Sequence, residues 1–327
     1  MYLLNFLKGM MTLLFSNQDL KKFIEEKIYV KSDKVKNYRE QVNRLRNNLE
    51  AYIKDTPDFG LVKMLHSGSV RKGTAISTLN DMDVAVYVKP DKVRDYDESQ
   101  VLNYVRDGLV KVYKKHNMKE EQFSIGQHCV KVSFRGSGLD VDVVPVIPNG
   151  ELNDLGHLIT KDTGEKVLTS IPLHLDFIRK RKNDYPNFAP MVRVTKWWRN
   201  QRGLKFKSFL IELIWAHIAD TEGISDDIVT ALQQFYRYIV NTELSENIIF
   251  TDNYSSDEVK IDTNTVNIFD PVNPKNNVGV SLDYFKKERI IDEADEALGY
   301  LSHAVQASTK STAIASLREI FGSSFAY

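Results

Sequence analysis

The pattern of hydrophobic and polar residues changes period along the chain, and each period predicts a different kind of element. From residue 35 to residue 52, six apolar or aromatic residues recur every three or four positions. This spacing predicts a long amphipathic helix that starts at Asp33 and ends at Pro57. Ser16 and Asp19 form a capping-box pattern, which predicts a shorter helix over residues 16–28. Two helices are therefore expected ahead of the first strand.

Short apolar runs follow these helices and predict strands. After a brief apolar run over 61–65, strands are expected over 81–88, 129–134 and 139–147. A turn containing two glycines separates the last two strands, which predicts a hairpin. One amphipathic helix, over 97–115, is expected between the first two strands.

From residue 148 onward the pattern first becomes loop-rich and then helical. Residues 148–175 are expected to form loops, with turns at Gly150 and Gly164. Helices are predicted over 174–181, 191–202, 207–219, 226–241 and 281–307. The pattern thus predicts a mixed α/β first half followed by a helical second half.

The first fifteen residues are mostly apolar. This run is too short to span a bilayer, and it lacks the basic start and the small-residue cleavage site of a signal peptide. Two interpretations remain: a helix packed on the protein, or a segment that precedes the true start at Met10 or Met11. We favour the second, and we expect no association with a membrane.

Composition narrows the class of protein further. The chain has 327 residues, 42% of them hydrophobic and 27% charged, and its formal net charge is zero. Any basic site must therefore be local, because nothing global attracts nucleic acid or a membrane. The single cysteine, Cys129, excludes intramolecular disulfides and Cys-rich zinc modules. It lies in a strand-like run and is expected to be small and buried rather than a nucleophile, in a reducing compartment.

Candidate chemistry centres on the strand over 81–88. Because side chains alternate along a strand, Asp81 and Asp83 project from the same face. Two carboxylates this close raise each other's pKa unless a cation lies between them, and Mg²⁺ is the simplest cation. Gly68 and Ser69, just upstream, offer backbone N–H groups and a hydroxyl to a phosphate. The sequence therefore predicts metal-assisted phosphoryl or nucleotidyl transfer.

A third carboxylate is expected on a neighbouring strand. Asp140 and Asp142 share one face of the strand over 139–147, and a carboxylate there is costly to bury unless it meets a cation. Spacing alone leaves the choice between the two open, with a small preference for Asp142. The alternative is that the aspartates lie at a solvated sheet edge. Three carboxylates would hold two metal ions, one at the attacking hydroxyl and one at the departing pyrophosphate.

A P-loop is a competing interpretation of the glycine-rich segment. Gly68 and Gly73 have the required spacing, but Thr74 occupies the position where that motif needs lysine, and Lys72 comes too early. An ATPase of that class is therefore disfavoured.

The helical half offers further groups for a nucleotide. Lys196 lies in the middle of a predicted helix, Ser208 begins the next helix, and Phe209 follows it. A helix start with a hydroxyl and lysines suits a triphosphate, and an aromatic ring could stack on a base. Each signal is weak alone, because Phe209, Trp197 and Trp198 are more typical of a core than of a binding site.

Taken together, these residues resemble a known family. The segments GSVRKGTAIS, DMDVAVYV, VDVVPV, VTKWW and DPVNPKNNVG resemble the oligoadenylate-synthetase and cGAS-like branch of the polymerase-β-like nucleotidyltransferases. Within it, SFRGSGLDVDVVPV, TSIPLHLDFI, FKSFLIELI and FGSSF resemble the bacterial CD-NTases of anti-phage CBASS systems. The resemblance implies a mixed α/β (α+β) fold with an N-terminal spine helix. It also implies an apolar extension over 1–16, a nucleotidyltransferase core over 17–189 and a helical lobe over 190–327.

The resemblance also implies roles for the candidate residues. Asp81, Asp83 and Asp142 would be catalytic and would bind two Mg²⁺ ions, which Mn²⁺ could replace. Gly68, Ser69, Lys196, Ser208 and Phe209 would bind the nucleotide, although many family members carry tyrosine in place of Phe209. The zinc module of animal cGAS is missing from this sequence.

The implied activity is the synthesis of a cyclic oligonucleotide messenger from ATP, with cyclic tri-adenylate favoured over a cyclic dinucleotide, in the bacterial cytoplasm. The implied partners are a HORMA-domain protein and an AAA+ ATPase. A double-stranded DNA activator could contact Arg39, Arg44 and Arg46 or Arg179, Lys180, Arg181 and Lys182, although solvated helix faces explain these runs equally well. The alternatives are a template-independent RNA 3′-end nucleotidyltransferase of the CCA- or poly(A)-adding type, and a catalytically idle nucleic-acid- or partner-binding module.

Overall fold

A mixed sheet of seven strands forms the first half of the protein. The computed structural model describes residues 15–55, 60–89, 100–114, 116–150, 154–161 and 163–326. The strands are β1 (Leu61–His66), β2 (Asp81–Val88), β3 (Phe123–Ile125), β4 (Val130–Phe134), β5 (Leu139–Pro148), β6 (Gly156–Ile159) and β7 (Lys166–Thr169). Their order is β1-β2-β5-β4-β3, with β6 paired to the end of β5 and to β7. Only β2 and β5, among the described strands, run parallel to each other.

Alternation along β2 and β5 separates an apolar face from a polar one. Met82, Val84, Val141 and Val143 are buried in one core with the two helices that cover this face, α3 (Ser32–Asp55) and α6 (Val101–Lys114). The apolar stripe predicted for the long helix is confirmed, because its residues from position 38 to position 49 are buried in that core. The aspartates of β2 and β5 therefore face the other side of the sheet.

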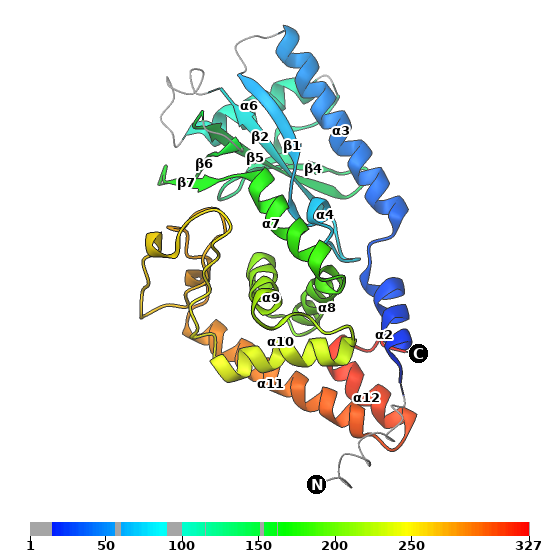
Figure 1. Ribbon diagram of the computed structural model, residues 1–327. Helices are drawn as coiled ribbons and strands as arrows, with labels where there is room; N and C mark the ends of the chain where they lie inside the picture. The colour runs from blue at the N-terminus through cyan, green and yellow to red at the C-terminus, as the bar shows by residue number, and fades with distance from the viewer. Residues whose placement is uncertain are drawn as a thin grey trace.

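The second half of the protein is helical, as predicted. Its helices are α7 (Ile171–Asp184), α8 (Phe188–Gln201), α9 (Ser208–Glu222), α10 (Ile228–Thr242), α11 (Tyr284–Gln306) and α12 (Lys310–Phe321). In Figure 1, α7 lies between the sheet and the other helices, and the loop-rich segment between α10 and α11 lies below β6 and β7. The short helical turns are α4 (Gly68–Lys72), η1 (Ile24–Ile28), η3 (Glu120–Gln122), η5 (Ser256–Glu258) and η6 (Val278–Ser281).

The N-terminal helix packs on this helical half rather than on the sheet. Helix α2 (Asn17–Phe23) begins with the expected capping box of Ser16 and Asp19 and continues into η1 as a π-helical turn. Phe23 contacts the rings of Trp197, Phe321 and Phe325, and the C-terminal end lies beside α2 in Figure 1. Helix α2 therefore contributes to the core of the helical half.

Several elements differ from their predicted bounds. The segment expected to be loop-rich contains β6 and β7, which form an antiparallel hairpin. A further helix, α12, follows the helix that was expected to be the last. Cys129 precedes β4 and is only partly buried. The predicted helix end at Pro57 lies outside the described residues, as do residues 1–14.

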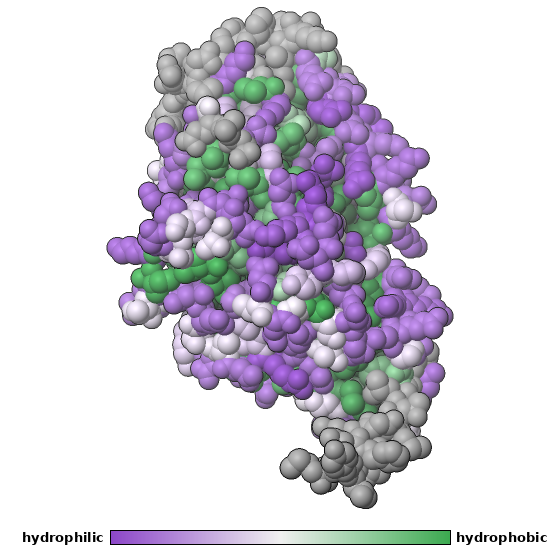
Figure 2. Space-filling view, viewed as in Figure 1, coloured by the Kyte–Doolittle hydropathy of each residue, from purple (hydrophilic) through white to green (hydrophobic). Residues whose placement is uncertain are grey.

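The surface is mostly hydrophilic on the face shown in Figure 2, with hydrophobic patches where the sheet half meets the helical half. No helix in the described part of the chain is both long enough and apolar enough to cross a membrane.

Candidate active site

The predicted carboxylates come together on the polar face of the sheet. The parallel register of β2 and β5 places Asp81 opposite Asp140 and Asp83 opposite Asp142. The expectation that a second aspartate strand lies directly beside the first is therefore confirmed. Burial, and then the charges of Asp81 and Asp142, raise the pKa of Asp83 to about 6. Such a shift is what two unneutralised carboxylates produce in a partly desolvated site.

Asp142 and Asp140 differ in how well their oxygens are satisfied. Asp140 accepts hydrogen bonds from Ser133 Oγ (2.7 Å) and Lys131 Nζ (3.3 Å). Asp142 Oδ1 is buried and accepts no hydrogen bond from the described residues, although Lys131 Nζ lies 3.8 Å away. Burial also raises the pKa of Asp142. The unpaired oxygen beside Asp83 favours Asp142 over Asp140 as the third carboxylate.

These residues fit a divalent cation. Carboxylate oxygens are the ligands that Mg²⁺ prefers, and a cation would relieve both the raised pKa of Asp83 and the unpaired oxygen of Asp142. Within the described ranges, no three acidic, histidine or cysteine side chains already converge on one point as a ligand set. Asp83 and Asp142, side by side on adjacent strands, would provide oxygens for such an ion.

Gly68 lets the backbone approach Asp83 closely. Its φ of +67° lies in the left-handed region, and a Cβ atom built on it would lie 1.7 Å from Asp83 Oδ2. Only glycine fits this position. The Ser69 carbonyl accepts a hydrogen bond from Thr74 N (2.8 Å), which closes the turn after α4. The side chain of Ser69 is partly exposed, and Ser69 does not line the cavity described next.

A cavity of about 650 Å³ lies between the sheet and the helical half. Asp83, Gly68 and Lys72 line it on the sheet side, and Lys207 and Phe209 line it from the start of α9. The hairpin β6–β7, helix α7 and the segment over 270–281 contribute the remaining wall. The cavity therefore joins the carboxylate site to an aromatic ring, as nucleotide binding requires.

Phe209 lies where a base could stack. Lys72 Nζ lies 4.8 Å from the centre of its ring, and His174 meets the ring edge-to-face at 5.6 Å. His174 Nε2 in turn lies 2.8 Å from Asp270 Oδ1, and Asp270 is itself buried in the cavity wall. Burial opposes ionisation of Asp270, but the charge and hydrogen bond of His174 outweigh it and lower the pKa of Asp270. Sequence reasoning missed His174 and Asp270 as wall residues, although their segments were among the family motifs.

Two of the predicted nucleotide ligands lie behind the cavity wall. Lys196 is 2% exposed, and its Nζ donates to Glu212 Oε1 (2.7 Å) and to the backbone and side chain of Thr74. Ser208 Oγ accepts a hydrogen bond from Arg199 (3.0 Å). Neither residue lines the cavity. In the present arrangement, Lys72 is the lysine from the sheet side that reaches it.

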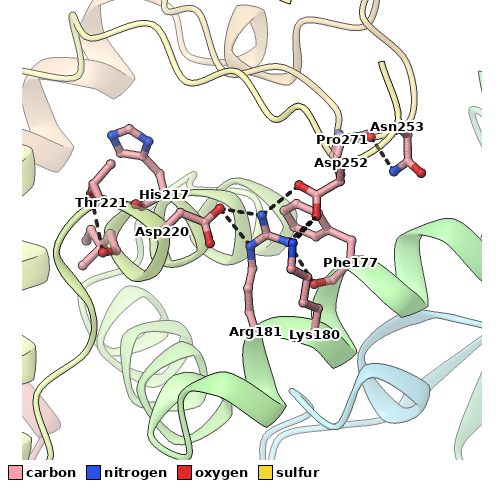
Figure 3. A network of polar contacts seen from close by, with 10 residues as sticks. Phe177, Lys180, Arg181, His217, Asp220, Thr221, Asp252, Asn253 and Pro271 are labelled. Atoms are coloured by element: carbon pink, nitrogen blue, oxygen red, sulfur yellow. Dashed lines mark hydrogen bonds and ion pairs between the residues drawn. The ribbon is translucent and has the colours of Figure 1, made fainter. Parts of the chain in front are cut away.

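The basic run on α7 is largely occupied by structural contacts. Figure 3 shows the Arg181 guanidinium between Asp220 and Asp252, above the ring of Phe177. The Arg181 side chain is only 3% exposed, and its N–H donors are used inside the protein. Lys182 Nζ donates to the Lys72 carbonyl (3.1 Å).

The other basic candidates are more accessible. Arg179 pairs with Asp176, and Lys180 Nζ lies 3.5 Å from Asp252 Oδ1, but both basic side chains are well exposed. On α3, Arg39 and Arg44 are exposed and Arg46 is partly buried. These residues stay candidates for a basic surface.

Comparisons with known proteins agree with this geometry. Residues 14–162 match the Second Messenger Oligonucleotide or Dinucleotide Synthetase domain. The chain is 42% identical over 315 residues to a cyclic AMP-AMP-AMP synthase of Escherichia coli strain MS 115-1, covering 94% of this chain and 97% of that one. It is 30% identical over 286 residues to the CBASS oligonucleotide cyclase CdnC of E. coli strain KTE188, covering 86% and 90%.

Solved structures show the same fold over nearly the whole chain. A complex of E. coli MS115-1 CdnC with a HORMA protein superposes with a TM-score of 0.86 at 41% identity, covering 95% of this chain and 98% of that one. The Vibrio cholerae cyclic AMP-GMP synthase DncV superposes with a TM-score of 0.70 at 13% identity, covering 96% and 97%, which shows a shared fold. The expected polymerase-β-like nucleotidyltransferase fold is thus confirmed.

The same relatives decide between the functional alternatives. The relatives over most of the chain are named as oligonucleotide cyclases, not as RNA 3′-end nucleotidyltransferases. An idle binding module is equally unsupported, because the three carboxylates are present on adjacent strands. The chain is an enzyme that synthesises a cyclic oligonucleotide, and it belongs to the CD-NTases, the nucleotidyltransferases of bacterial anti-phage CBASS systems.

Proposed function

We propose that this enzyme joins ATP molecules into cyclic tri-AMP in a magnesium-dependent reaction. The observation that carries the proposal is the strand register that places Asp142 beside Asp83, which lines a cavity that Phe209 also lines. The name of the 42%-identical relative, cyclic AMP-AMP-AMP synthase, supports the choice of base and of ring size. A structure of E. coli MS115-1 CdnC with ATP, at 41% identity over 96% of this chain, supports the choice of substrate.

Asp81, Asp83 and Asp142 would hold the metal in this proposal. Mg²⁺, when bound, lowers the pKa of an attacking sugar hydroxyl and neutralises charge on the departing pyrophosphate. Asp142 would lie nearest the attacking hydroxyl, because its unpaired oxygen is available to orient that group. Gly68 keeps the backbone of the phosphate-binding turn in contact with the Asp83 carboxylate.

Other residues would bind and orient the nucleotide. Phe209 would stack on adenine at the far end of the cavity. The turn at Gly68 and Ser69 would approach the triphosphate with backbone N–H groups. Lys196 and Ser208 would act at the phosphates only after they exchange their present contacts with Glu212 and Arg199.

We further propose a HORMA-domain regulator, because the structural relative at 41% identity is a CdnC:HORMA complex. An AAA+ ATPase is a proposed second regulator on the family resemblance. A double-stranded DNA activator would use the exposed Arg39 and Arg44 rather than the buried Arg181. Its binding should weaken steeply with salt, and charge reversal at Arg39 and Arg44 should abolish it. We also propose the bacterial cytoplasm as the location.

Incubation with labelled ATP and Mg²⁺, with and without a HORMA protein and DNA, tests the catalytic proposal. Phosphatase-resistant product with the mass of cyclic tri-AMP is expected from the wild-type chain, and none from the Asp83→Asn variant. A different nucleotide in the product would overturn the assignment to ATP. Full activity of Asp83→Asn would overturn the assignment of the carboxylates.

A further inference from the structure

A buried cluster of charged side chains lies directly behind the cavity wall. Glu212, on α9, is 3% exposed and accepts hydrogen bonds from three side chains. Lys72 Nζ donates to its Oε2 (2.8 Å), whereas Lys196 Nζ and Thr74 Oγ1 donate to its Oε1 (2.7 Å each). The cluster thus joins α8 and α9 of the helical lobe to α4 and the turn that follows it.

One carboxylate, Glu212, lies between two lysines in this cluster. Burial alone would raise the pKa of Glu212, but Lys196 and then Lys72 outweigh it and lower the pKa to about 2. An ionised carboxylate this deep in the protein is stable only when it is paired. Burial lowers the pKa of Lys196, although the charge and hydrogen bond of Glu212 oppose this. Glu212 therefore pairs with one lysine deep in the protein and with a second, Lys72, that lines the cavity.

The two lysines differ in where their remaining donors point. The Lys196 ammonium is 3% exposed, and its contacts with Glu212 and with both oxygens of Thr74 use its three N–H donors. The Lys72 side chain is 14% exposed and lines the cavity. Among the described residues, its ammonium donates one hydrogen bond, to Glu212, and lies over the face of Phe209. Lys72 therefore has donors left for a ligand.

The position of Lys72 matches the middle of a bound nucleotide. Phe209, Asp83 and Lys72 line the same cavity, and Lys72 Nζ lies 4.8 Å from the centre of the Phe209 ring. If a base stacks on Phe209 and its phosphates reach the carboxylates, the triphosphate must pass Lys72. A cation at this point neutralises phosphate charge without occupying the metal site.

We propose that Lys72 is a ligand of the nucleotide triphosphate and that Glu212 is the positioning residue that holds Lys72 at the cavity wall. This inference rests on the proposed use of a nucleoside triphosphate. In this arrangement the Lys72 ammonium keeps its hydrogen bond to Glu212 and gains one to a phosphate oxygen. The spacing of Lys72 excludes it as a P-loop lysine, but in this proposal it also binds a phosphate, from a different backbone geometry.

Calorimetric titration of the full-length chain with ATP, ADP and AMP, with Ca²⁺ in place of Mg²⁺, tests the role of Lys72. Lys72→Met should lower the affinity for ATP about tenfold to a hundredfold, as expected for a lost hydrogen bond between charged groups. The loss should decrease from ATP to AMP, whereas a general disturbance of the fold would weaken all three equally. Arg71→Met is the matched control, because Arg71 is exposed on the same helix and does not line the cavity.

Equal ATP affinity of the wild-type chain and Lys72→Met would overturn the assignment of Lys72. Failure of the wild-type chain to bind ATP, while it binds another nucleoside triphosphate, would instead overturn the proposed substrate, and the Lys72 comparison would then be made with that nucleotide. The two failures are therefore distinguishable.

A double-mutant cycle tests the positioning role of Glu212. Glu212→Gln should weaken ATP binding, and the Glu212→Gln/Lys72→Met pair should lose no more than Lys72→Met alone, because Glu212 acts through Lys72. Losses that multiply would show that Glu212 acts independently and would overturn its role. Lys72→Arg should recover part of the ATP affinity, which keeps the Lys72 assignment testable if Glu212→Gln fails to fold.

Discussion

Removing the charge of Asp83 should stabilise the metal-free protein while it abolishes the reaction. The pKa of this carboxyl rises from 3.8 to about 6 on folding. At about 1.4 kcal/mol per unit, the shift means that ionised Asp83 costs the folded state about 3 kcal/mol. Asp83→Asn keeps the shape and removes the charge. The free energy of unfolding of the variant should therefore exceed that of the wild-type chain by up to about 3 kcal/mol.

The size of this stabilisation depends on pH. Because the folded-state pKa is the higher one, the folded protein binds more protons than the unfolded chain between pH 3.8 and about 6. The stability of the wild-type chain therefore falls as pH rises through this window. Above it, ionised Asp83 destabilises the folded state by the full amount. The advantage of Asp83→Asn should be small near pH 4 and reach its maximum above pH 7.

Urea denaturation in the presence of EDTA, at several pH values from 4 to 8, measures this difference. Asp140→Asn is the matched control, because Ser133 and Lys131 already satisfy Asp140. It should lower stability by about 1 kcal/mol or less, as expected for a partly exposed pair. Added Mg²⁺ should stabilise the wild-type chain, so that it becomes more stable than Asp83→Asn. A metal-free Asp83→Asn variant that is less stable at pH 7.5, or a difference independent of pH, would refute the reasoning.

Five further substitutions, at Gly68, Phe209, Arg181 and Lys180, test the site and the buried ion pairs of α7. Gly68→Ala should abolish product formation while the rest of the protein stays folded, because the new Cβ would displace the Asp83 carboxylate; an active variant with an unchanged product rate would contradict this. Phe209→Leu should raise the KM for ATP about tenfold, as expected when a base loses its stacking partner. Phe209→Tyr should retain the wild-type KM. Equal KM values for the wild-type chain and both variants would argue against stacking. Arg181→Met should lower the free energy of unfolding by about 3 kcal/mol, because it breaks a buried ion pair. Lys180→Met should lower it by less than about 1 kcal/mol, because Lys180 is exposed. Thermal or urea unfolding measures both losses, and equal losses would contradict the argument from burial.

Long periodic elements were predictable from the sequence because their burial pattern is local. The strand over 81–88 could be predicted because side chains change face at each residue of a strand. The same alternation places Asp81 and Asp83 on one face. The helix α3 followed equally directly from its apolar stripe. By contrast, β6 and β7 are four residues long, and neither shows enough alternation to be distinguished from a loop.

The environment of the candidate site was less predictable, because partners distant in sequence determine it. Spacing alone gave only a weak preference for Asp142 over Asp140. The structure supports that preference, because Asp140 is already hydrogen-bonded whereas Asp142 Oδ1 is not. Lys196 and Lys72 could not be ranked without knowing that Glu212 pairs with both, 16 and 140 residues away. For the same reason, the basic run ending in Lys182 did not reveal that Arg181 points into the protein.

The packing of α2 on the helical lobe has a consequence for how the chain folds during synthesis. Phe23 lies 4.7 Å, centre to centre, from the ring of Phe325, and the Ile228 N–H donates to Asn17 Oδ1 (2.8 Å). Helix α2 therefore cannot complete these contacts until the segment that carries Phe325 has left the ribosome. The sheet and its two covering helices draw their core from residues 38–159 and can fold earlier. A nascent chain stopped near residue 190 should thus contain a folded sheet while α2 is still without its partners, so that assembly of the lobe is the late, slow step.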